Sequence, residues 1–376
     1  MVYWILWSIW ITFILYQSLI YLGASRSLKK YKAKAGAGDE PLRNRPLPEG
    51  VSVLVCAHNE LANLRELLPL LYNQNFYPYE IIVVDDRSTD GSLDFLLEQQ
   101  SQQALLRLVW LRKRPAHIKG KKFALSMGIR AARYDKILLT DADCRPQSPQ
   151  WVREMSHLLE GNTQFVLGYS PYLYENSWLN AFIRFETLQT ALLYLGAALS
   201  GRPYMGVGRN LAYRKSFFMQ HKGFRGHWHI NGGDDDLWVN RYANSKNSAV
   251  SLDDRTKVCS VPKRQWHAYF RQKKRHLHVG KYYRRKDKLW LGALSLSEII
   301  SWVGIIPLIF LANEPYSIIA GLILKWFALL VAFKTAAGKF NEPINIAQLP
   351  ILNILYVIYL LVTGTSALFS KNTRWS

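Results

Sequence analysis

The sequence predicts an α/β domain with a mostly parallel sheet, joined to several transmembrane helices. Between residues 50 and 262, short apolar runs alternate with stretches of helical periodicity, the order that gives a parallel sheet flanked by helices. Residues 1–22 and 289–370 are much more apolar. A segment of about 20 apolar residues is long enough to cross a bilayer. We therefore predict a soluble domain held between membrane segments.

The predicted strands and helices follow one another in a regular order from residue 51. A strand in "VSVLVCAHNE" precedes a helix in "LANLRELLPLLYNQ", and "YEIIVVDDRSTDGS" holds the second strand. A third strand in "ALLRLVWLRK", a helix in "KGKKFALSMGIRAARY" and a fourth strand in "KILLTDAD" complete the pattern. Ligands of such sheets bind beyond the carboxyl ends of the strands. We expect one rim of the sheet to carry His58, Asn59, Asp86, Asp141 and Asp143.

Two carboxylates, Asp141 and Asp143, end the fourth strand in "KILLTDADCRP". Side chains of a strand alternate between its faces, so these acids project to the same side and repel each other unless a positive charge lies between them. The spacing therefore predicts a cation site. A strand exit at which an aspartate caps a helix would explain the same residues without a ligand.

Four apolar segments are candidates for membrane spans. The first, "MVYWILWSIWITFILYQSLIYL" (1–22), has no charged side chain. It lacks the basic start of a cleavable signal peptide, so we interpret it as a retained anchor. The other three cover 289–312, 315–333 and 346–370.

Basic residues next to these segments predict that the soluble domain is cytoplasmic. They are concentrated in the linker 23–49, in the stretch 263–288, and at Lys334 and Lys339. The tail 371–376 is also basic, although four spans would place it outside. The last segment could therefore be re-entrant or interfacial instead. We expect a multi-pass protein of the cell membrane, such as a bacterial inner membrane.

Lysine and arginine outnumber the acidic residues by 48 to 27, which gives a formal charge of +21. Such a charge predicts a polyanionic partner: nucleic acid, an anionic membrane surface or a phosphate-bearing substrate. The basic residues gather beside the apolar segments, so we favour the membrane over nucleic acid. The three cysteines, Cys56, Cys144 and Cys259, are widely spaced, which argues against a disulfide framework or a zinc site.

Two further stretches have the composition of helices that lie along a membrane surface. In "KRQWHAYFRQKKRHLHVGKYYRRKDK" (263–288), aromatic and basic residues alternate with roughly helical spacing. Residues 177–200 mix apolar and aromatic side chains, which fits either an interfacial helix or a core helix of the soluble domain. The glycine-rich loop "GVGRN" that follows lets the backbone approach a ligand closely.

Five short elements occur in order along the chain: "VSVLVCAHNE", "IIVVDDRSTDGS", "DAD", "GVGRNLAYRKSFF" and "GGDDDLWVN", followed by "QKKRH" and membrane segments. Together they resemble the family 2 glycosyltransferases of the GT-A fold. Within that family the chain looks like membrane-integrated members such as ceramide glucosyltransferase, cellulose synthase and hyaluronan synthase. A lone D-x-D motif is weak evidence, whereas five elements in this order are strong.

The resemblance implies transfer of a sugar from a nucleotide-sugar donor, a UDP- or GDP-sugar, with Mg²⁺ or Mn²⁺ as cofactor. A divalent cation that bridges a carboxylate and the diphosphate neutralises the leaving group. The resemblance makes Asp143 a metal ligand, while Asp141 shares the metal or holds the ribose. It assigns donor binding to Cys56, His58, Glu60, Asp86 and Lys121, and to Gln272, Arg275 and His276 of an element similar to Q-x-x-R-W.

The segment "GGDDDLWVN" (232–240) resembles the one that carries the general base of inverting transfer, commonly Glu-Asp-x-Asp in relatives. This register makes Asp234 the base that takes the proton from the acceptor hydroxyl. Gly233 stands where Glu is usual, so Asp235 is the alternative. A helix N-terminus, whose dipole favours acids, would explain one or two of the three aspartates without catalysis.

The acceptor is predicted to be a lipid hydroxyl that enters from the bilayer. The acceptor loop is expected to comprise Gly206, Gly208, Arg209 and Asn210. Three C-terminal segments suit the admission of a lipid better than a polymer channel, so we predict the transfer of one sugar. A processive polysaccharide synthase is the alternative within the family. A transporter or a membrane protein that binds an anionic polymer is the alternative outside it.

Overall fold

The chain folds into two compact units. The computed structural model describes residues 1–31, 49–118, 120–311 and 315–369, with side chains to residue 364. Within these, the sheet unit comprises residues 49–173 and 201–262, and the helical unit comprises residues 1–31, 174–200 and 263–369. Most of the predicted linker 23–49 and all of the tail 371–376 lie outside the described residues.

The sheet unit contains, within its described residues, a seven-stranded sheet of order β3-β2-β1-β4-β7-β6-β8. Its strands are β1 (Val51–Ala57), β2 (Tyr79–Asp86), β3 (Leu106–Leu111), β4 (Lys136–Asp141), β6 (Phe165–Gly168), β7 (Leu211–Arg214) and β8 (Ser248–Ser251). β3, β2, β1 and β4 are parallel, as are β6 and β8, whereas β7 is antiparallel to both neighbours. β5 (Cys144–Pro146) and β9 (Val258–Ser260) form a separate antiparallel pair. The predicted mostly parallel sheet is confirmed.

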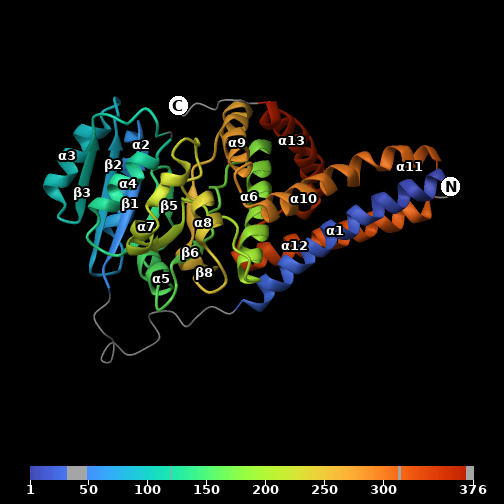
Figure 1. Cartoon of the computed structure of the whole chain (residues 1–376), viewed down its shortest axis with the longest axis horizontal. Coiled ribbons are helices and arrows are strands. Elements are labelled where there is room, and N and C mark those ends of the chain that lie inside the picture. The colour runs from blue at the N-terminus through green and yellow to red at the C-terminus, as the bar shows by residue number, and fades with distance from the viewer. Residues whose placement is uncertain (32–48, 119, 312–314, 370–376) are drawn as a thin grey trace. The chain divides into compact units, whose positions relative to one another are not determined.

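Helices pack on both faces of the parallel strands. The helices of this unit are α2 (Leu61–Tyr72), α3 (Ser92–Gln102), α4 (Lys122–Ala131), α5 (Trp151–His157), α7 (Lys215–Gln220) and α8 (Asp236–Tyr242). Val53 and Val55 of β1 share one apolar core with the leucines of α2 and with Trp151 of α5. Leu54, on the other face, meets α4 at Gly128, where an added Cβ would lie 2.3 Å from Leu54 Cδ1. Burial on both faces explains the continuous apolar run of β1, and Figure 1 shows α2, α3 and α4 around these strands.

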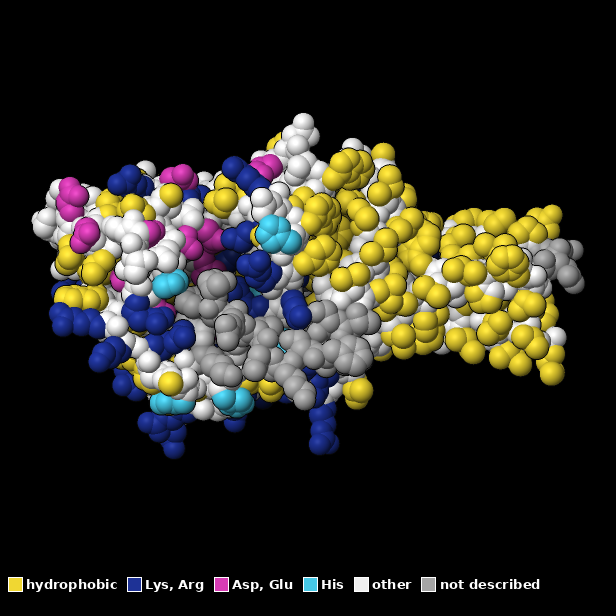
Figure 2. Space-filling view, turned by 90° about the horizontal axis from the view of Figure 1, so that it is seen from above, with side chains coloured by type: hydrophobic (Ala, Val, Ile, Leu, Met, Phe, Trp, Pro, Cys, Tyr) yellow, Lys and Arg dark blue, Asp and Glu magenta, His cyan; other side chains and the backbone are white. Residues whose placement is uncertain are grey.

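The helical unit contains the predicted membrane segments. Its helices are α1 (Val2–Lys30), α6 (Trp178–Leu199), α9 (Trp266–Gly280), α10 (Arg285–Val303), α11 (Ile305–Leu311), α12 (Tyr316–Phe340) and α13 (Leu349–Phe369). Among the described residues, four stretches are long and apolar enough to cross a membrane: Val2–Lys30, Arg285–Leu311, Tyr316–Phe340 and Ile346–Gly364. Figure 2 shows hydrophobic side chains over most of the visible surface of these helices. Such a surface suits a lipid environment, because soluble monomers rarely expose large apolar patches.

α6 belongs to the helical unit, although the chain on either side of it belongs to the sheet unit. It packs against α1, α12 and α13. Gly196 of α6 meets α1 so closely that an added Cβ would lie 2.9 Å from the Cβ of Ala24. Residues 177–200 are therefore not a core helix of the soluble domain, because their apolar side chains are buried among membrane-length helices. Their interfacial position stays a prediction.

A buried ion pair joins α6 to α9 within the helical unit. Lys273 Nζ lies 2.5 Å from Glu186 Oε2, and both side chains are about nine-tenths buried. Tyr269, one turn before Lys273 on α9, donates to the same carboxylate oxygen at 3.4 Å. The pair matches one acid with one base, so burial leaves no net charge.

Candidate active site

The carboxyl ends of β1, β2 and β4 lie side by side, as the sequence predicts. Cys56 of β1 stands in register with Val84 of β2 and with Asp141 of β4. Beyond the strand ends, His58 Nδ1 lies 2.6 Å from the main-chain oxygen of Asp86. The register therefore brings four of the predicted site residues to one rim of the sheet.

Asp90 fastens the loops that follow β1 and β2. Its carboxylate accepts hydrogen bonds from the main-chain nitrogens of Leu61 and Ser92, each at 3.0 Å, and so caps the first turns of α2 and α3. Partial burial opposes ionisation, but the bonds from Ser92 and Leu61 outweigh it and lower the pKa of Asp90. Asn59 adds a bond between the same loops by accepting from the main-chain nitrogen of Thr89 at 2.8 Å.

Asp86 presents one carboxylate oxygen that is not used within the described chain. Its side chain is buried, and Oδ1 accepts a bond from Arg87 Nε at 2.8 Å. Oδ2 is buried without a hydrogen-bond partner among the described residues. Leaving a buried acceptor unsatisfied costs about 1–3 kcal/mol, so such an atom marks a place where a ligand donor group fits. This observation supports the predicted nucleobase contact of Asp86.

A single ammonium group holds two of the predicted site acids together. Lys121 Nζ lies 2.7 Å from Asp141 Oδ1 and 3.3 Å from Asp234 Oδ2. Burial alone would lower the pKa of Lys121, but Asp141 and Asp234 outweigh burial and raise it well above its usual value. Lys121 therefore stays charged. The rim of β4 and the segment before α8 meet at this residue.

Asp234 and Asp235 are adjacent but ionise differently. Burial would raise the pKa of Asp234, yet Lys121 and Lys122 outweigh it and lower the pKa. Burial and the charge of Asp234 together raise the pKa of Asp235. Asp234 is therefore the acid that is held as a carboxylate at neutral pH by two nearby cations.

Both carboxylate oxygens of Asp235 accept hydrogen bonds from main-chain nitrogens. Its Oδ2 accepts a bond from the nitrogen of Gly208 at 2.7 Å, and its Oδ1 accepts one from the nitrogen of Asp236 at 2.8 Å. It thereby caps α8 and fastens the loop that contains Gly208. These bonds favour Asp234 over Asp235 as the acid that faces a substrate.

The segment before Asp234 adopts a backbone that glycine favours. Gly232 and Gly233 have φ values of +87° and +77°, which L residues rarely adopt. A glutamate at position 233, as in relatives, would be strained in this conformation. The structure thus gives a physical reason for the departure of Gly233 from the family pattern.

Lys122 was missed by sequence reasoning. Its Nζ donates hydrogen bonds to the main-chain oxygens of Ile230, at 2.6 Å, and of Gly232. The pattern offered one signal: α4 begins with two lysines, although a helix dipole disfavours cations at the N-terminus. Two lysines at this position therefore indicate a partner nearby. Here the partner is the acidic segment, residues 230–236, which contains three aspartates.

The residues present fit a divalent cation whose coordination is completed by a substrate. The described residues contain no group of three or more His, Cys, Asp and Glu side chains that could hold a metal ion. The predicted metal ligands, Asp141 and Asp143, supply two carboxylates. Mg²⁺ is commonly bound by one or two carboxylates together with substrate phosphates, so this donor set suits a metal that arrives with a diphosphate.

Arg209 lies near the same two acids. Its guanidinium carbon lies 4.4 Å from the ring centroid of Tyr172, and Nη1 is buried without a hydrogen-bond partner among the described residues. Burial would lower the pKa of Arg209, but Tyr172, Cys144, Asp143 and Asp141 outweigh it and raise the pKa. The predicted acceptor loop therefore places a cation beside the predicted metal ligands.

Asn210 is a core residue, so we do not assign it to the acceptor site. It is completely buried, and its Nδ2 donates to the main-chain oxygens of Tyr169 and Thr256, both at 2.8 Å. Its Oδ1 accepts a bond from Trp151 Nε1 at 3.0 Å. Gly206 is also structural, because an added Cβ would lie 2.9 Å from Val239 Cγ2.

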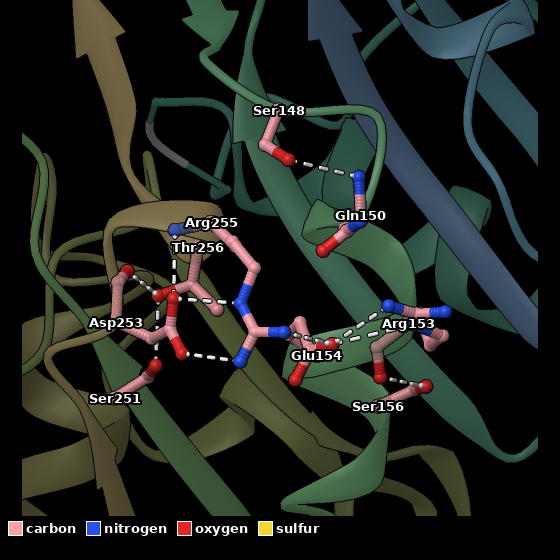
Figure 3. Close-up of polar contacts among 9 residues, drawn as sticks. All are labelled: Ser148, Gln150, Arg153, Glu154, Ser156, Ser251, Asp253, Arg255 and Thr256. Atoms are coloured by element: carbon pink, nitrogen blue, oxygen red, sulfur yellow. Dashed lines mark hydrogen bonds and ion pairs between the residues drawn. The ribbon is translucent and has the colours of Figure 1, made fainter. Parts of the chain in front are cut away.

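Figure 3 shows polar contacts that hold residues 251–256, the segment whose Thr256 carbonyl accepts a bond from Asn210. Arg255 lies between two acids, with Nη2 at 2.6 Å from Asp253 Oδ2 and Nη1 at 3.3 Å from Glu154 Oε1 of α5. Thr256 Oγ1 lies 2.7 Å from Ser251 Oγ and donates to the main-chain oxygen of Asp253. This network fixes the Thr256 carbonyl that receives the Asn210 amide.

Lys121, Asp141 and Asp234 together form the Lys121 cluster. No described contact joins the remaining predicted donor-binding residues to this cluster. Glu60 precedes α2, and its Oε2 accepts a bond from Asn63 Nδ2 at 2.6 Å. Gln272, Arg275 and His276 lie on α9 in the helical unit. Their contributions to donor binding stay predictions.

A mostly parallel sheet with acids gathered beyond its strand ends defines a GT-A-type α/β domain. Residues 52–221 match the family model described as Glycosyl transferase family 2. The chain therefore carries a glycosyltransferase family 2 domain.

Three known proteins illustrate this similarity. Hyaluronan synthase of Pasteurella multocida is 34% identical over 126 residues, 33% of this chain and 12% of that protein. Dolichol-phosphate mannosyltransferase of Mycosarcoma maydis is 32% identical over 124 residues, 31% of this chain and 40% of that protein. The matches thus span less than half the length of either relative.

The third is a solved structure, the mannosyltransferase PcManGT from Pyrobaculum calidifontis in complex with GDP-Man and Mn²⁺. It has a TM-score of 0.61 at 20% identity, and the alignment covers 96% of this chain and 100% of that chain. This likeness shows a shared fold.

Proposed function

We propose that the protein is a membrane-bound, inverting glycosyltransferase that moves one sugar from a nucleotide-sugar donor to a lipid acceptor. The observation that carries the proposal is the Lys121 cluster, which joins Asp141 of the D-x-D motif to Asp234 of the acidic segment in a family 2 domain. The four membrane-length helices and the similarity to a dolichol-phosphate mannosyltransferase support a lipid acceptor. The basic residues next to these segments support a catalytic domain on the cytoplasmic side of a cell membrane.

The donor would be held at the rim of the sheet. Asp86 Oδ2 accepts a hydrogen bond from the nucleobase, which satisfies its unused buried oxygen. Asp143 and Asp141 would bind Mg²⁺ or Mn²⁺, which supplies positive charge to the departing diphosphate. Arg209 Nη1, which has no hydrogen-bond partner among the described residues, would add a charge-assisted hydrogen bond to the same anion.

The acceptor would be activated by Asp234. Its carboxylate is kept ionised by Lys121, so it can take the proton of an acceptor hydroxyl as the anomeric carbon is attacked from the opposite side. Lys121 also neutralises Asp141, which reduces the repulsion that three nearby acids would exert on an incoming diphosphate.

A direct test is nucleotide release by the purified, detergent-solubilised protein. UDP- and GDP-sugars would be supplied with Mg²⁺ or Mn²⁺, with and without membrane lipid. We expect release that needs the metal, is stimulated by lipid, stops with a chelator and is lost in Asp143→Asn. Absence of release with every donor would overturn the proposal.

The similarity to hyaluronan synthase supports a second candidate, a processive polysaccharide synthase. The two candidates differ in product. A single glycolipid whose mass rises by one sugar supports the first, whereas release without lipid and a growing polymer supports the second.

A further inference from the structure

The segment that leads to Asp234 is held through its main chain. Lys122 is completely buried, and its ammonium group bonds the carbonyl oxygens of both Ile230 and Gly232. These two residues come four and two positions before Asp234. A single side chain on the first turn of α4 therefore bonds this segment at two main-chain positions.

The segment needs such a contact because its two glycines give the backbone more conformational freedom than other residues would. Gly232 and Gly233 have positive φ values, and glycine loses more conformational freedom on folding than any other residue. The two loops also touch: a Cβ added to Gly120 would lie 3.1 Å from Asn231 Oδ1 and 3.4 Å from the nitrogen of Gly232. Asn231 and Gly232 thus pack against Gly120, just before α4.

Lys121 and Lys122 divide their contacts with the acidic segment. Lys121 pairs with the carboxylates of Asp234 and Asp141, while Lys122 bonds main-chain carbonyls. We propose that Lys122 is a positioning residue that fixes residues 230–232 so that the Asp234 carboxylate stays beside Lys121. This inference rests on the proposed function, because it concerns the geometry of the proposed base.

The charge of Lys122 suits this task. Burial lowers the pKa of Lys122, and the acids Asp234, Asp236 and Asp235 oppose that shift. Within the described chain, no acid lies within ion-pair distance of its Nζ, and its donors go to carbonyl oxygens. A buried lysine used only to fill space would be disfavoured against an apolar side chain, so the two carbonyl contacts explain its presence.

The chain offers a matched control in Lys136 of β4. Lys136 is 6% exposed, and its Nζ donates to the main-chain oxygen of Ser156 at 3.2 Å. It stands at the opposite end of β4 from Asp141. Its Nζ also lies 3.4 Å from Glu49 Oε2. Lys136→Met therefore removes another buried lysine, bonded to a carbonyl, that does not touch the acidic segment.

The experiment compares Lys122→Met, Lys122→Arg and Lys136→Met in the full-length protein. A displacement of about 1 Å at a catalytic group can lower a rate about 100-fold. We expect Lys122→Met to lower kcat by roughly that factor with donor KM within about twofold, and Lys122→Arg to recover most of it. Lys136→Met should lower thermal stability to a similar degree and leave kcat nearly unchanged.

A second readout does not depend on activity. Amide hydrogen exchange of the peptide that spans residues 229–236 should rise in Lys122→Met and stay at the wild-type level in Lys136→Met. If Lys122→Met does not fold, Lys122→Gln replaces it, because its shorter side chain cannot reach both carbonyls.

The outcomes separate this inference from the proposed function. A wild-type protein that releases nucleotide, with kcat and exchange unchanged in Lys122→Met, overturns the positioning role alone. Parallel losses in Lys122→Met and Lys136→Met also overturn it, because they indicate general destabilisation. A wild-type protein that cleaves no donor overturns the proposed function, while the exchange measurement still decides whether Lys122 fixes the segment.

Discussion

Buried charge occurs in both units of the chain, but the balance of signs differs. In the helical unit, Glu186 and Lys273 form a pair of one acid and one base at 2.5 Å. In the sheet unit, one ammonium group, that of Lys121, lies between Asp141 and Asp234, with Asp235 next in sequence. A balanced pair needs no further ion to be stable. Where two acids share one ammonium group, a metal ion or a proton can still be bound, and that capacity distinguishes a site from a structural contact.

The largest expected effect is loss of turnover in Asp234→Asn. A positioned general base contributes roughly 10²–10⁴-fold to rate, so kcat for nucleotide release should fall by that factor. The matched variant is Asp235→Asn, which should lose less, because the Asp235 carboxylate binds main-chain nitrogens instead of substrate. Equal losses in both variants, or a larger loss in Asp235→Asn, would reverse the assignment of the base.

The balanced pair should instead determine stability. Removing one partner of a buried ion pair costs about 3–5 kcal/mol, so Lys273→Met should lower the free energy of unfolding by that amount. The double variant Glu186→Leu with Lys273→Met should recover most of the loss, because no charge is left unpaired. Unfolding of the protein in detergent micelles measures both effects. A double variant as unstable as the single one would mean that the pair has a role other than charge balance.

Burial of His227 should also make the sheet unit sensitive to pH. Burial, with a smaller contribution from the charge of Lys122, lowers the pKa of this imidazole to about 4. The unfolded chain, with a pKa near 6.5, then binds a proton before the folded chain does. Stability is therefore lost as pH falls from about 6.5 to about 4, by up to roughly 3 kcal/mol.

The variant His227→Asn removes this titration. Its free energy of unfolding should change less than that of the wild type between pH 7 and pH 4.5. A wild-type protein whose stability is constant over this range would show that His227 is not held neutral by the fold.

The smallest effect is expected at an acid of the sheet unit that lies outside the Lys121 cluster. Asp90 caps the first turns of α2 and α3, so Asp90→Ala should cost about 1–2 kcal/mol, as the loss of a helix cap does. Donor affinity should fall as well, because the loop after Asp86 loses its anchor. Thermal denaturation and nucleotide binding measure the two effects. A loss of stability as large as that of Lys273→Met would contradict the expected difference between the two regions.

Much of the fold was predictable because its signals are local. The strands that end at Asp86 and Asp141 are apolar runs followed by acids, and the parallel order brings their carboxyl ends to one rim. Four apolar segments were likewise visible from composition, and the structure contains four helices of sufficient length within its described residues.

The burial of Lys122 and Asn210 was not predictable, because each depends on distant segments. Lys122 bonds carbonyls more than 100 residues away in sequence, and Asn210 is enclosed by Tyr169, Thr256 and Trp151. The lysines at the start of α4 indicated a partner but not which one, and no local pattern distinguishes a buried asparagine from an exposed one. The placement of α6 was ambiguous for the same reason, because the sequence of an apolar helix does not show which neighbours bury it.

The position of α6 in the chain has a consequence for how the protein is made. The sheet unit is discontinuous: the chain leaves it after residue 173 and returns at residue 201. The ribosome therefore completes β1 to β4 and then α6 before it makes β7, α8 and Asp234. Domains generally fold as units during synthesis, and this one cannot close its sheet until α6 has been released. Synthesis of α6 thus precedes completion of the acidic segment, and cutting out α6 would remove the link between the two parts of the sheet unit.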